Sequence, residues 1–163
     1  MTTRWLLAGC LLLGAAAPAH ALCTLACSCQ VVATPVVFAS VNPLSASPVD
    51  STGKVTVTCG GLGSLAVPYT LAASAGISGV MTSRRMAAGA NRLAYNLYTT
   101  STYLTVLGDG TGGTVTAAGS VLTGVLGQQA SQDTTLYGRI AGGQNQVVPG
   151  SFTDSVIVTV TYF

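Results

Sequence analysis

The sequence has 163 residues, of which 49% are hydrophobic and 6% are charged, with a formal net charge of +2 at pH 7. This apolar content excludes a disordered chain, and so weak a positive charge excludes an electrostatic surface for nucleic acid. All four acidic residues are aspartates, dispersed along the chain, and no nucleophile motif accompanies them. We therefore expect neither an enzyme nor a bound cofactor.

Residues 1–21 have the features of a secretory signal peptide. Arg4 supplies the positive start, residues 5–17 form an uncharged and largely apolar run, and Ala19-His20-Ala21 fits the small-x-small cleavage pattern. The apolar run is too short to span a bilayer, so we expect no membrane insertion. Cleavage would leave a single mature domain at residues 22–163.

Four cysteines follow the predicted cleavage site, namely Cys23, Cys27, Cys29 and Cys59. Export to an oxidising compartment favours disulfides. Cys29 and Cys59 lie in strand-like sequence and are candidates for joining neighbouring strands, whereas Cys23 and Cys27 are candidates for a small second loop. A zinc site is the weaker interpretation, because no histidine and no second paired-cysteine motif accompanies these residues in the mature chain.

Alternating apolar residues, separated by segments rich in glycine and proline, predict an all-β chain. The strand candidates are residues 30–41, 54–59, 65–72, 92–98, 103–107, 121–126, 134–140 and 152–163, with a short strand near residues 85–86. Loops are expected at residues 42–53, 73–90 and 141–150. Pro35 interrupts the first candidate and indicates an edge strand or a crossing between sheets. Strands at this spacing, without an amphipathic helix, predict a β-sandwich.

The last strand candidate has one apolar face, formed by Val156, Val158, Val160 and Tyr162 at alternate positions. The sequence ends on this strand, and an uncovered hydrophobic edge promotes pairing with another chain. We therefore expect a strand from another molecule beside it. Asp154 shares the same parity and would need a partner if it points inward; Arg139 is the candidate.

Two further groups of residues are candidates for a binding role. The basic group is Arg84, Arg85 and Arg92, and the aromatic group is Tyr95, Tyr98 and Tyr103. An acidic surface or a glycan would suit the first group, and stacking on a sugar would suit the second. We favour a solvated loop for the arginines and packing for the tyrosines, because isolated surface charges contribute little and aromatic residues on strands usually pack.

Several segments in the same order resemble the spore coat protein U family, which includes the pilins of archaic chaperone–usher systems. They are Ala33-Thr-Pro-Val-Val-Phe38, Lys54-Val-Thr-Val-Thr-Cys59, Leu93-Ala-Tyr-Asn-Leu-Tyr98, Thr135-Leu-Tyr-Gly-Arg-Ile140, and Val148-Pro-Gly-Ser-Phe-Thr-Asp154 leading into Val156-Ile-Val-Thr-Val-Thr-Tyr162. The Tyr-Gly-Arg segment and the Pro-Gly-x-Phe-x-Asp entry to the last strand are together the most diagnostic.

The resemblance implies an immunoglobulin-like β-sandwich that lacks its final strand, with a disulfide between Cys29 and Cys59. The strand bordering the resulting acceptor groove would carry Phe152, Val156, Val158, Val160, Tyr162 and Phe163. The implied partners are a periplasmic pilus chaperone, an outer-membrane usher and neighbouring pilus subunits. The resemblance also implies export through the periplasm to the surface of a Gram-negative bacterium, in pili that support adhesion and biofilm formation.

One feature departs from that pattern. Pilins of this type carry a donor segment ahead of the first family cysteine, whereas only residues 22–28 separate the predicted cleavage site from Cys29. These residues lack a long alternating apolar pattern, so the chain is better suited to accept a strand than to donate one. The alternative functions are a single-domain adhesin or binding module and a spore or matrix coat protein.

Overall fold

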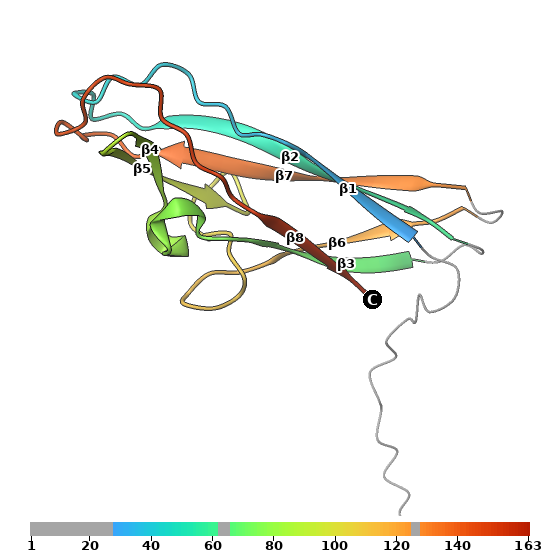
Figure 1. The fold of residues 1–163 in the computed structure, drawn as a ribbon. Coiled ribbons are helices and arrows are strands. Elements are labelled where there is room, and N and C mark those ends of the chain that lie inside the picture. The colour runs from blue at the N-terminus through green and yellow to red at the C-terminus, as the bar shows by residue number, and fades with distance from the viewer. Residues whose placement is uncertain (1–27, 62–65, 125–127) are drawn as a thin grey trace, which may run out of the picture.

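The computed structural model describes residues 28–61, 66–124 and 128–163 (Figure 1). The predicted signal peptide and the proposed Cys23–Cys27 loop lie outside the described residues. No helix in the described ranges is long and apolar enough to cross a membrane.

The larger of two antiparallel sheets has the strand order β1-β2-β7-β5-β4. Its strands are β1 (Ser28–Thr34), β2 (Val49–Gly60), β7 (Ala130–Ile140), β5 (Asn91–Tyr98) and β4 (Arg85–Ala88). The pairing of β2 with β7 is the longest and runs from Val49 opposite Ile140 to Cys59 opposite Ala130. Strand β1 forms one edge of this sheet, and within the described ranges only β2 pairs with it.

The smaller sheet has the order β6-β3-β8, with β6 (Ala117–Leu122), β3 (Ala66–Ala73) and β8 (Val158–Tyr162). In Figure 1 this sheet lies beneath β1, β2 and β7. Alternate residues of both sheets meet in one core. Its largest fully buried apolar side chains are Val55, Val57, Cys59, Val67, Tyr69, Leu71, Leu107, Val121 and Ile140. The predicted all-β, immunoglobulin-like sandwich is confirmed.

Several element boundaries differ from the prediction. The first strand ends at Thr34, before Pro35, and residues 103–107 form only isolated bridges at Val106 and Leu107. Strand β2 begins at Val49 rather than at Lys54, because its turn-like first residues pair across to β7. Regular pairing in the last strand begins only at Val158. Upstream of it, Thr153 forms a bridge to Ala87 of β4, so the segment leaves the larger sheet before it joins the smaller one. The predicted loop after β3 contains two 3₁₀ turns, η1 (Gly76–Ser78) and η2 (Met81–Ser83).

Candidate functional site

A groove of about 850 Å³ opens between residues 33–43, which follow β1, and residues 147–158, which lead into β8. Its floor is supplied by the larger sheet, through Met86, Leu93, Tyr95, Leu97, Leu136 and Ile140. These six side chains are at most 8% exposed. The groove therefore reaches the sandwich core and has an almost entirely apolar floor.

The β1 side of the groove exposes apolar side chains that point toward the sandwich interior. Val31 lies directly opposite Val57, and residues directly opposite one another in an antiparallel pair point to the same face. Val57 is fully buried, but Val31 is 44% exposed. The inner face of the sandwich is therefore uncovered along this edge.

Beyond Pro35 the chain lies against the larger sheet, over two glycines. A β-carbon placed on Gly138 would lie 2.6 Å from Val36 Cγ1 and 2.8 Å from Phe38 Cζ, and one on Gly53 would lie 2.7 Å from Val36 Cγ2. Any side chain at either position would push this segment away from the sheet. The two glycines thus set the position of one groove wall.

Strand β8 presents an open backbone edge on the other side of the groove. Ser74 N–H donates to the carbonyl of Ile157 at 2.9 Å, and Phe163 N–H donates to the carbonyl of Pro68 at 3.1 Å. Antiparallel ladders alternate, so the odd-numbered residues of this strand direct their backbone groups toward β3. Val158, Val160 and Tyr162 direct theirs to the opposite edge, where no strand of the described residues pairs with β8.

The predicted groove-strand residues lie in three different places. Phe152, Val156 and Val158 line the groove. Val160 packs partly against the core. Tyr162 and Phe163 lie beyond the groove, at the end of β8, and are 42% and 45% exposed.

The hypothesis of an Asp154–Arg139 pair is wrong. Arg139 lies on the outer face of the larger sheet and donates to both carboxylate oxygens of Asp50, with Nε–Oδ1 at 2.6 Å and Nη2–Oδ2 at 2.7 Å. Asp154 instead approaches from the inner face and accepts a hydrogen bond from the Tyr95 hydroxyl at 2.7 Å. Burial and the neighbouring Asp154 carboxylate raise the pKa of Tyr95.

The three arginines of the basic group have different environments. Arg84 is fully buried, and burial lowers the pKa of its guanidinium. That guanidinium donates to the carbonyls of Ala73, Ser74 and Met81 and to Asn96 Oδ1. Arg85 and Arg92 are exposed and line a second cavity of about 320 Å³, together with Ile77, Ser78, Val80 and Ser83. Nothing in the sequence indicates that Arg84 is buried while Arg85 and Arg92 are exposed.

The three tyrosines of the aromatic group also lie in different environments. Tyr95 is buried in the groove floor, whereas Tyr103 lies over the outer face with its ring 3.6 Å from the Arg139 guanidinium carbon. Tyr98 and Tyr137 meet that ring edge-on, at centroid distances of 5.4 and 6.4 Å. Tyr103 holds a left-handed backbone, with φ of 55°. Ring packing and the stacked cation account for a bulky residue in this conformation.

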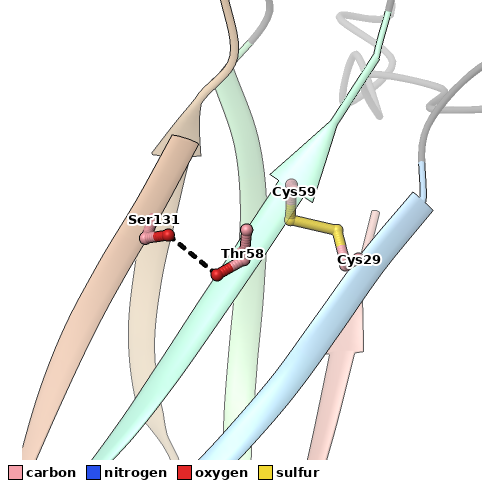
Figure 2. Close-up of a disulfide and its surroundings, with 4 residues drawn as sticks. All are labelled: Cys29, Thr58, Cys59 and Ser131. Carbon is pink, nitrogen blue, oxygen red and sulfur yellow. Dashed lines mark hydrogen bonds between the residues drawn. A yellow bond between two sulfur atoms is a disulfide. The ribbon is translucent and has the colours of Figure 1, made fainter. Parts of the chain in front are cut away.

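The disulfide implied by the resemblance is confirmed. Cys29 of β1 and Cys59 of β2 lie directly opposite each other and are bonded (Figure 2). On the other side of β2, the hydroxyls of Thr58 and Ser131 are 2.7 Å apart and link β2 to β7. The disulfide thus fastens the edge strand β1 to β2, and the hydroxyl contact fastens β2 to the central strand β7. No cluster of three potential metal ligands occurs within the described ranges.

No curated protein matches this chain. Its fold is similar to a chain of the CsuC–CsuE chaperone–tip adhesion subunit pre-assembly complex, from the archaic chaperone–usher Csu pili of Acinetobacter baumannii, with a TM-score of 0.52 and 19% sequence identity. The match covers 82% of this chain and 39% of that one, so this protein corresponds to well under half of its length. A family model, the Spore Coat Protein U domain, matches residues 15–159. The protein belongs to the spore coat protein U family.

Proposed function

We propose that this protein is a pilus subunit of the chaperone–usher type, which completes its sandwich by accepting a strand from another chain. Spore coat U proteins of this kind are structural proteins and not enzymes. The similar solved structure is a complex of a chaperone with a pilus subunit, which supports a chaperone as the first partner. Neighbouring subunits would then take its place in the assembled fibre.

The single observation that carries this proposal is the open edge of β8 beside an apolar groove. The backbone groups of Val158, Val160 and Tyr162 offer a hydrogen-bonding template for an added strand. Alternate side chains of that strand would enter a groove whose floor is apolar. Each aliphatic side chain buried there contributes about 1.5–3 kcal/mol, so a few of them would hold a strand tightly.

The signal peptide, the export route and the acceptor role are inferred from the sequence. We take residues 1–21 as a signal peptide and residues 22–163 as the pilin domain, exported to the periplasm and assembled at an outer-membrane usher. The finished pilus would lie on the surface of a Gram-negative bacterium and support adhesion and biofilm formation. We assign this subunit the role of strand acceptor, because residues 22–28 lack the pattern of a long donor.

Co-expression in a Gram-negative periplasm, with and without the cognate chaperone, tests the proposal. We expect soluble subunit only as a complex with the chaperone. Val158→Asp places a charge in the groove and should abolish co-purification. Thr159→Asp is the matched control, because Thr159 is the next residue on the same strand and its side chain is exposed. A soluble monomer made without chaperone would refute the proposal and favour a self-complete adhesin or coat protein.

A further inference from the structure

The groove wall formed by residues 152–157 is held by hydrogen bonds to a partly buried carboxylate, that of Asp154. The Asp154 carboxylate accepts from the Tyr95 hydroxyl at 2.7 Å and from the backbone N–H of Ile77 at 2.9 Å. Tyr95 belongs to β5 of the larger sheet, and Ile77 belongs to turn η1, which follows β3 of the smaller sheet. One carboxylate therefore ties the wall to both halves of the sandwich.

A second link joins the same wall to the end of β3. Ser74 N–H donates to the Ile157 carbonyl, and Ser74 Oγ accepts from Ile157 N–H, both at 2.9 Å. The Ser74 carbonyl in turn accepts from Arg84 Nε at 2.9 Å, and Arg84 Nη1 donates to Asn96 Oδ1 of β5 at 2.7 Å. The fully buried Arg84 guanidinium thus anchors Ser74, and Ser74 in turn anchors Ile157.

The backbone is shaped to admit the carboxylate. Gly76 has φ of 62°, and a β-carbon there would lie 2.6 Å from Asp154 Oδ1. A side chain at position 76 would displace the carboxylate, and the left-handed conformation independently favours glycine. The fit between Gly76 and Asp154 is therefore a specific feature of the fold.

These contacts replace what a neighbouring strand would otherwise supply. Residues 152–157 have one bridge to β4, between Thr153 and Ala87, and join the ladder with β3 only from Ile157 onward. Their groove side is lined by Phe152 and Val156 and pairs with no strand of the described residues. A segment with so few backbone bonds would shift readily without side-chain anchors.

We propose that the Asp154–Tyr95 contact preorganises the groove for strand uptake, so that both are positioning residues for the incoming strand. This inference rests on the proposed function. With the contact in place, the open edge is already aligned when a strand arrives, and less ordering accompanies binding. Once a strand fills the groove, it holds the wall by itself, so the contact matters more in the empty subunit than in the filled one.

The test compares the two states with one variant. Tyr95→Phe removes the hydroxyl and keeps the ring in the groove floor. The empty subunit is obtained from its chaperone complex by denaturation and refolding at low concentration. The probe is a fluorescent peptide copying the strand that the cognate chaperone inserts, and its association with this refolded subunit is followed by stopped-flow anisotropy. We expect association to slow by about tenfold, the order set by losing one hydrogen bond to a charged group. The melting temperature of the peptide-filled variant should stay close to that of the filled wild type.

Asp50→Asn is the matched control, because it removes an outer-face carboxylate bonded to Arg139 and leaves the groove intact. We expect it to leave the association rate unchanged. Asp154→Asn keeps one oxygen acceptor and should fall between Tyr95→Phe and wild type. Hydrogen exchange in the empty Tyr95→Phe subunit should quicken at residues 152–157.

Equal association rates for Tyr95→Phe and wild type would overturn the inference alone. Equal destabilisation of the empty and filled variants would also overturn it, because the contact would then be merely structural. Failure of the wild-type subunit to bind the peptide would instead overturn the proposed function, and this inference with it.

Discussion

The position of Val36 over Gly138 predicts that Gly138→Ala will be destabilising, although alanine ordinarily suits a strand better than glycine. The new β-carbon would lie 2.6 Å from Val36 Cγ1, whereas ordinary contact begins at 3.4 Å, so the two groups must separate by about 0.8 Å. Overpacking of this kind costs about 1–3 kcal/mol. Reduced freedom of the unfolded chain offsets about 0.4–1 kcal/mol. We therefore expect a net loss of about 1–2 kcal/mol.

Urea unfolding of the subunit, refolded from its chaperone complex at low concentration and followed by circular dichroism, measures this loss. Val36→Ala removes both methyl groups that approach the glycines, so the double variant Val36→Ala/Gly138→Ala should be less destabilised than the sum of the two single variants. We expect a coupling free energy of at least about 0.5 kcal/mol. Additive effects, or a Gly138→Ala variant more stable than wild type, would show that the glycine is not required by the crossing segment.

Three further changes have defined outcomes. Replacing Cys29 and Cys59 by serine should lower the free energy of unfolding by about 3–4 kcal/mol, the loop-closure value for 30 residues of separation, in guanidinium titrations; a loss under about 1 kcal/mol would contradict this. The Arg139 guanidinium lowers the pKa of Asp50 in the folded state below its ordinary 3.8, so the stabilisation that Asp50 provides is present above that pH and is lost as the pH falls further. The stability difference between wild type and Asp50→Asn, from melting curves between pH 7 and 2.5, should therefore shrink in acid, and a constant difference would refute the assignment. Tyr103→Ala should be less stable than Tyr103→Gly by about 1 kcal/mol in urea titrations, because only glycine adopts the left-handed backbone without strain; equal stabilities would exclude that strain.

The sequence was sufficient for the fold class, because alternation is visible wherever one face of a strand is buried. Val55, Val57 and Cys59 are fully buried, as the alternation in residues 54–59 predicts. Val156 and Val158 have the same parity in the sequence, and both line the groove. These features depend only on the period of two along a strand, which needs no knowledge of neighbours.

Features that depend on a partner distant in sequence were not predictable. Residues 49–53 have the composition of a loop, but their pairing with β7 makes them a strand. The sequence offers Arg139 as a candidate partner of Asp154, whereas the face of the sheet decides the pairing: Tyr95 points inward and Arg139 points outward. A correct assignment required the register of β5 against β7, which local sequence does not contain.

Arg84 and Arg85 are adjacent arginines, but their surroundings predict opposite tolerance to substitution. The Arg84 guanidinium serves four acceptors in different directions from a fully buried position. A lysine ammonium has three hydrogens and no planar fork, so it would leave at least one buried acceptor unpaired. Arg85 is exposed and lines the second cavity. In a library carrying every amino acid at each position, residue 84 would retain arginine alone, while residue 85 would vary widely.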